Sequence, residues 1–339
     1  MPSPEPAGSR LARYFTDFPD RRYIMFGGKG GLGKTTFSAA TAYHLARRGY
    51  KVLVFSVDPQ ASLSDIFQRD IFGRGPVEIV PGLFAQEIDA DQRIRAYQQE
   101  IRQKILDMYG FDRVPEEIEH YIAAASAEPA MEESAIFDQV VDIVVTGGYD
   151  YFIYDLVPLG HALYYLSMAS VYDEWIERIT RLREEMQQYA EMAARMKGEQ
   201  LQEDLILAEL QDIRRRITIS SSILTDAART AFFFVIIPEE MALLDTRKAA
   251  QLFAKFQVPI SGYIVNRVLP ETLAQQDIPE YLRRRLQMQR GHLEEIRTLF
   301  GGEVLAYVPE FERDVTGLAM IERMADAMFG GNGRGPATD

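Results

Sequence analysis

The 339-residue sequence contains no cysteine. Disulfide bonds, thiolate-bound zinc, iron–sulfur clusters and cysteine nucleophiles are therefore excluded. Long apolar runs are missing as well, because none approaches the roughly 20 residues that a membrane-spanning helix needs. Residues 1–20 also lack the apolar centre of a signal peptide. We therefore expect a cytoplasmic protein with neither a zinc site nor an iron–sulfur site.

Basic residues are fewer than acidic ones. The chain has 37 lysines and arginines against 50 aspartates and glutamates, which gives a net charge of −13. A surface of this sign repels phosphate backbones and anionic lipid headgroups. The two arginine triplets, at residues 214–216 and 283–285, are better explained as solvated helix faces than as binding patches. We therefore expect no nucleic-acid partner.

Short apolar runs alternate with longer helical patterns along much of the chain. Several runs are nearly continuous, which is typical of strands buried on both faces of a parallel sheet. The alternation predicts an α/β fold with a doubly wound, mostly parallel sheet. The expected strands are residues 23–26, 52–57, 82–88, 151–155, 231–237, 263–266 and 304–308.

Two stretches, residues 91–140 and 171–220, interrupt this alternation. Both carry apolar side chains at steps of three and four, which predicts amphipathic helices. We expect these helices to form a subdomain inserted into the sheet domain. The predicted division is a core of residues 20–90, 141–170 and 225–329, a helical subdomain of residues 91–140 and 171–224, and flexible ends at residues 1–19 and 330–339.

A glycine-rich loop separates the first expected strand from a helix, and it matches the P-loop pattern G-x4-G-K-T. Glycines let backbone amides approach phosphates, and the start of a helix adds positive potential. Lys34 is expected along the β- and γ-phosphates of ATP, and the Thr35 hydroxyl on Mg²⁺. The expected nucleotide ligands in this loop are Gly28, Gly30, Gly31, Gly33, Lys34, Thr35 and Thr36.

A second lysine, Lys29, lies inside the loop. The segment from Lys29 to Thr35 resembles the deviant Walker A motif of septum-positioning, chromosome-partition, nitrogenase-iron, arsenite-pump and tail-anchored-targeting ATPases. The resemblance implies a homodimer in which Lys29 reaches the nucleotide of the partner subunit. Its positive charge then meets the developing transition state only when two subunits close. Lys29 and Lys34 are therefore candidate catalytic residues.

Two aspartates follow expected strands, at the edge where such sheets bind nucleotides. Asp58 begins a segment, 58–67, that is similar to the first switch of the arsenite-pump and tail-anchored-targeting branch. The resemblance implies that Asp58 orients or activates the attacking water. Asp155 ends the strand 151–155 and has the position of a Walker B carboxylate. Both aspartates are expected to hold Mg²⁺ through water.

The resemblance extends over roughly residues 20–330. Residues 155–161 are similar to the branch's second switch, although residues 156, 157 and 159 depart from it, and His161 is either a switch residue or a local packing group. Asn266 is implied to read the adenine, and Pro309 to lie in the adenine loop. Glu239 either contacts nucleotide across the dimer or caps a helix.

Three functions stay open for the cargo of this ATPase. Met186, Met192 and Met196 lie on an amphipathic stretch that could line a groove for a membrane helix, which favours targeting of tail-anchored clients. The alternative is the catalytic subunit of an arsenite or antimonite efflux pump that works with a membrane partner and without cysteine ligands. A positioning ATPase of the chromosome-partition type ranks third, because the chain is acidic.

Overall fold

The structure, a computed structural model, describes residues 8–57, 62–109, 113–116, 147–155, 226–255 and 258–330, with isolated residues between 119 and 223. The chain divides into two compact units. Residues 1–89, 148–163 and 225–339 form the first unit, and residues 90–147 and 164–224 form the second.

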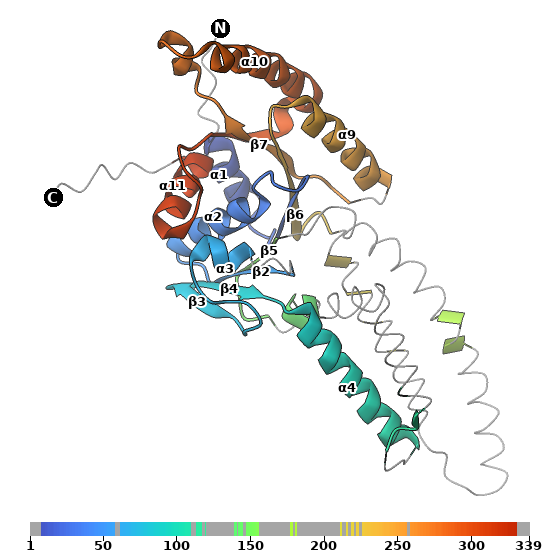
Figure 1. Cartoon of the computed structure of the whole chain (residues 1–339). Coiled ribbons are helices and arrows are strands. Elements are labelled where there is room, and N and C mark those ends of the chain that lie inside the picture. The colour runs from blue at the N-terminus through green and yellow to red at the C-terminus, as the bar shows by residue number, and fades with distance from the viewer. Residues whose placement is uncertain are drawn as a thin grey trace, which may run out of the picture. The chain divides into compact units, whose positions relative to one another are not determined.

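Within the described residues of the first unit, eight strands form one sheet in the order β3-β4-β2-β5-β1-β6-β7-β8 (Figure 1). Neighbouring strands run parallel, except for the antiparallel pair of β3 and β4 at one edge. This arrangement confirms the predicted α/β fold with a mostly parallel sheet. The strands are β1 Tyr23–Gly27, β2 Val52–Ser56, β3 Val77–Val80, β4 Leu83–Glu87, β5 Tyr151–Asp155, β6 Thr230–Ile236, β7 Gly262–Val268 and β8 Val304–Pro309.

Helices flank this sheet, and the interior strand β6 shows how both of its faces are covered. Phe233 points to one face, where its ring packs against Tyr14 and Phe26. Phe232 and Phe234 point to the other face and pack against Phe253. The helices of the first unit are α1 Gly8–Asp17, α2 Lys34–Arg47, α3 Ser62–Phe67, α9 Glu240–Lys255, α10 Glu280–Phe300 and α11 Gly317–Phe329, with short 3-10 turns at Glu271–Gln275 and Gly301–Glu303.

The expected flexible segment over residues 1–19 is wrong for residues 8–17, which form α1. Leu11, Tyr14 and Phe15 recur at steps of three and four and are buried. Their side chains belong to the main hydrophobic core, and the ring of Phe15 packs against Phe329 of α11. Tertiary packing therefore stabilises a helix that is too short to persist alone.

The described part of the second unit consists mainly of α4, Ala90–Tyr109. Arg102 on this helix forms an ion pair of 2.9 Å with Glu119. The helical hairpin expected at residues 171–220 lies almost wholly outside the described residues. Among the residues that are described, no helix is both long and apolar enough to cross a membrane.

Candidate nucleotide site

The loop between β1 and α2 has the backbone of a phosphate-binding loop. Gly28 has φ 146°, and a Cβ atom at this position would lie 2.6 Å from the carbonyl oxygen of Val235. Gly33 has φ 98° and immediately precedes α2, and a Cβ atom there would lie 2.9 Å from the Asn266 side chain. Both positions therefore require glycine, through conformation and through space.

The residues expected to bind phosphate and Mg²⁺ open α2. Lys34, Thr35 and Thr36 form its first turn, where backbone amides have no acceptor within the helix. The ammonium group of Lys34 folds back over the loop and donates a hydrogen bond of 3.3 Å to the carbonyl oxygen of Lys29. This first turn contains no acidic side chain, so its positive potential is not offset within the helix.

Asp155 lies beneath this helix at the end of β5, and only 3% of its surface is exposed. It stands in register with Phe26 of β1 on one side and Ser56 of β2 on the other. The hydroxyl of Ser38, one turn after Thr35 on α2, donates to Asp155 Oδ1 over 3.3 Å. Because residues three apart share a helix face, Asp155 and Thr35 lie on the same side of α2.

Lys29 does not point back into the loop. Its Nζ atom lies 2.9 Å from Oδ2 of Asp245 on α9, and the two side chains are 53% and 36% exposed. The two lysines of the loop therefore have different surroundings. Lys34 covers the loop, whereas Lys29 reaches an exposed helix of its own chain.

Two side chains from β7 brace the loop from the other side. The Asn266 amide donates a hydrogen bond of 2.9 Å to the carbonyl oxygen of Leu32, and the Arg267 guanidinium donates one of 3.2 Å to that of Gly31. Asn266 is expected to read adenine, and here its amide holds the phosphate loop. Pro309 ends the neighbouring strand β8, in register with Val268.

A match to a known family covers most of the chain. The family model for anion-transporting ATPases matches residues 21–330. This chain belongs to the anion-transporting ATPase family. It is therefore an ATPase, and the resemblance to the arsenite-pump and tail-anchored-targeting branch is confirmed.

Some relatives of this anion-transporting ATPase are named as arsenical pump-driving ATPases, and others are named as GET3 or ASNA1 ATPases. A protein of Aquifex aeolicus provisionally named arsenical pump-driving ATPase 1 is 32% identical over 91% of this chain and 79% of its own length. ATPase GET3A of Arabidopsis thaliana is 28% identical over 89% of this chain and 82% of its own length. ATPase ASNA1 homolog 2 of Paramecium tetraurelia is 26% identical, with 92% and 94% covered.

A cavity of about 770 Å³ lies between the start of α9 and α10 of this ATPase. Glu239, Arg267 and Tyr281 are among the residues that line it. Glu239 forms an ion pair of 3.1 Å with Arg285, one of the arginines expected on a solvated helix face. The sequence predicted that Glu239 either contacts nucleotide across the dimer or caps a helix, and Glu239 directly precedes α9 in the structure. Nothing in the sequence pointed to the Arg285 partner.

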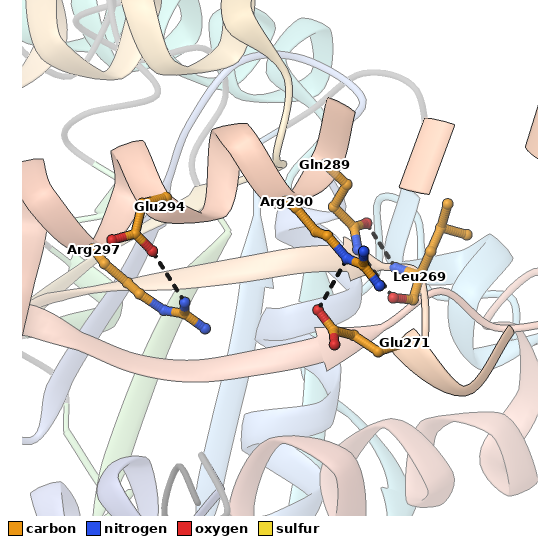
Figure 2. Close-up of polar contacts among 6 residues, drawn as sticks. All are labelled: Leu269, Glu271, Gln289, Arg290, Glu294 and Arg297. Carbon is orange, nitrogen blue, oxygen red and sulfur yellow. Dashed lines mark hydrogen bonds and ion pairs between the residues drawn. The ribbon is translucent and has the colours of Figure 1, made fainter. Parts of the chain in front are cut away.

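The α10 wall of this cavity is tied to the segment that follows β7. Figure 2 shows the Gln289 amide facing the backbone of Leu269, where it accepts a hydrogen bond of 2.8 Å and donates one of 3.0 Å. Beside it, Arg290 lies 3.6 Å from Glu271. Because Gln289 is buried, these bonds are shielded from water and fix α10 against the strand that carries Asn266.

Asp58 and His161 lie outside the described residues, and so do the methionines expected to line a groove, Met186, Met192 and Met196. Within the described part of the chain, no group of three or more histidines, aspartates and glutamates could hold a metal ion. Mg²⁺ commonly binds proteins through one or two side chains together with phosphate oxygens and water. Thr35 and Asp155 fit that role, because they lie on one side of α2 at the phosphate loop.

Proposed function

We propose that this ATPase works as a homodimer that requires Mg²⁺, and that ATP binding and hydrolysis close and open a helical subdomain of residues 91–140 and 171–224. The observation that carries the proposal is that the two lysines of the phosphate loop make different contacts. Lys34 covers its own loop, while Lys29 is exposed and reaches α9. An exposed lysine beside the loop is available to a second nucleotide site, whereas one folded into the loop is not.

The proposed role of each residue in ATP hydrolysis follows from the charge or hydrogen-bonding group that it carries. Lys34 and the loop amides hold the phosphates, Thr35 and Asp155 hold Mg²⁺, and Asp58 orients the attacking water. Lys29 of the partner subunit then adds positive charge beside the phosphate oxygens, where negative charge develops in the transition state. When bound, Mg²⁺ would neutralise negative charge on the phosphates.

The cargo is proposed to be the membrane helix of a tail-anchored client. Support comes from relatives named GET3A and ASNA1 homolog, and from the absence of cysteine, since soft metalloid ions favour thiolate ligands. The alternative cargo is arsenite or antimonite, moved by a membrane pump that this ATPase would drive. The names of the Aquifex relatives favour that alternative.

The test measures steady-state ATP hydrolysis with arsenite, with antimonite and with a detergent-solubilised tail-anchored helix. We expect the helix to change turnover and the metalloids to leave it unchanged. Stimulation by either metalloid would contradict the proposed cargo and favour the pump.

The dimer is tested separately with Lys29→Ala, which should lower kcat more than nucleotide affinity. Lys255→Ala is the matched control, because Lys255 is an exposed lysine at the far end of α9 from Asp245, the partner of Lys29. Sedimentation with a non-hydrolysable ATP analogue should show a dimer for the wild type. A monomer under these conditions would refute closure across a dimer.

A further inference from the structure

The carboxyl group of Glu87 is buried, and no role for it follows from the phosphate loop. Glu87 ends β4 and is 1% exposed. A buried carboxyl group is costly unless its oxygens are hydrogen-bonded. Here Oε1 accepts a bond of 2.6 Å from the amide of Leu63, and Oε2 accepts one of 3.1 Å from the amide of Ser64. The Ser64 hydroxyl also donates to Oε2.

These bonds attach the start of α3 to the sheet. Leu63 and Ser64 are the second and third residues of this helix, so Glu87 accepts from amides that have no acceptor within the helix. A carboxylate at this position is also favoured by the helix dipole. The attachment therefore fixes both the position and the direction of a helix that has only six residues.

The same residue also holds the chain that follows α3. The Ser64 hydroxyl oxygen accepts a hydrogen bond of 3.2 Å from the amide of Ile71. The main-chain carbonyl of Glu87 accepts one of 3.1 Å from the amide of Gly73. Leu63 and Ile71 are fully buried beside these bonds. Glu87 thus holds the start of α3 through its side-chain carboxyl group, and it holds the chain after α3 through its main-chain carbonyl.

These bonds of Glu87 lie at the carboxyl ends of the parallel strands, where the candidate nucleotide site also lies. Ser56, the last residue of β2, stands in register with Glu87 on one side and with Asp155 on the other. The amide of Ile88 also donates to the carbonyl oxygen of Ser56 over 2.9 Å. Ser56 at the end of β2 therefore lies beside Glu87, and the start of α3 is bonded to Glu87. Asp58 falls between these two points in the sequence.

We propose that Glu87 is a positioning residue for ATP hydrolysis. By fixing the start of α3, it sets where the segment between β2 and α3 ends, and so where Asp58 is held relative to the phosphates. This inference rests on the proposed role of Asp58 in orienting the attacking water. Glu87 acts through this segment and needs no contact of its own with the nucleotide.

The test is Glu87→Gln, which keeps the size of the side chain but turns one acceptor into an NH₂ group that faces backbone donors. Displacing a catalytic group by about 1 Å can cost about 100-fold in rate. We expect kcat to fall by about 10- to 100-fold, while KM and the Kd of ADP change less than about twofold. Turnover is expressed per nucleotide-binding site, counted by titration with a fluorescent nucleotide.

Two further variants make the outcome decisive. Glu78→Gln on β3 is the control, because Glu78 also accepts a backbone hydrogen bond, of 3.3 Å from Gly82, but from an exposed position. It should leave kcat unchanged. Ser64→Ala removes only the hydroxyl bridge and should lower kcat by a smaller factor with KM unchanged. This variant decides the question if Glu87→Gln does not fold.

A purely structural role for Glu87 predicts a lower count of nucleotide-binding sites, with normal kcat at each site. That result would overturn the proposal. Asp58→Asn, measured in parallel, separates this failure from failure of the proposed function. If Asp58→Asn abolishes turnover and Glu87→Gln does not change it, only the inference about Glu87 is refuted. If Asp58→Asn retains full turnover, the proposed role of Asp58 is refuted first.

Discussion

Replacing His44 with phenylalanine should make this ATPase less sensitive to acid. His44 lies on α2, and its ring stacks on Phe329 of α11 at 3.8 Å between centroids and 10° between planes. Its Nε2 atom is buried with no hydrogen-bond partner among the described residues. Burial, and then the charges of Arg48 and Arg47, lower the pKa of His44 from 6.5 to about 4.

The lowered pKa of His44 makes the native protein less stable in acid. Between pH 6.5 and about 4, the unfolded chain takes up a proton at His44 that the native chain does not, so acid favours unfolding. This contribution to stability is fully present above pH 6.5 and is lost as the pH falls toward 4. For the two pKa values given, His44 alone should lower the free energy of unfolding by about 2 kcal/mol between about pH 7.5 and about pH 5.

The assay is urea unfolding of the wild type and of His44→Phe at both pH values, without nucleotide. The variant keeps an aromatic ring on Phe329 and has no proton to bind, so its loss of stability in acid should be smaller by about 2 kcal/mol. Met328→Leu, a volume-conserving change on the core face of α11, is the control and should lower stability equally at both pH values. Equal losses for the wild type and His44→Phe would refute the reasoning.

Two further predictions concern the phosphate loop. Gly28→Ala places a Cβ atom against the carbonyl of Val235 and strains the backbone, so the free energy of unfolding should fall by about 1–3 kcal/mol. Gly30→Ala is the control, because the space around its Cβ is open, and it should lower this free energy less. Equal losses for the two variants would contradict the clash at Gly28. The exposed Lys29–Asp245 pair should show a coupling free energy below about 1 kcal/mol in a double-mutant cycle with Lys29→Ala and Asp245→Asn. Added salt should decrease this coupling, because the charges are exposed to solvent. A larger coupling that does not depend on salt would mean that the pair is not an ordinary surface contact.

Local patterns account for the parts of the fold that were predicted. The strand, glycine loop and helix around Lys34 are contiguous in sequence, and each element has its own signal. The core strands were found because they are continuous apolar runs, and β6 is buried along its whole length. The edge strand β3 was missed because it has only four residues and pairs antiparallel with the next strand, across a turn at Gly82.

Contacts between distant residues account for what sequence reasoning missed. Lys29 and Asp245 belong to a loop and a helix that are far apart in the chain, and nothing local in either segment predicts their pairing. Glu87 carried a weak signal, since it is a carboxylate at the end of an apolar strand, like Asp58 and Asp155. Its hydrogen bonds with α3 depend on strand order, which places β4 beside β2.

The amide of Asn266 has a consequence for attempts to change which base this ATPase accepts. The side chain expected to recognise adenine is already bonded to the carbonyl oxygen of Leu32, and its nitrogen fills the space that a Cβ atom on Gly33 would need. Exchanging Asn266 for aspartate would set two oxygens against each other across the loop. We therefore expect that any change at Asn266 made to alter base preference would also disturb the phosphate loop, so that a redesign for guanine would have to rebuild both.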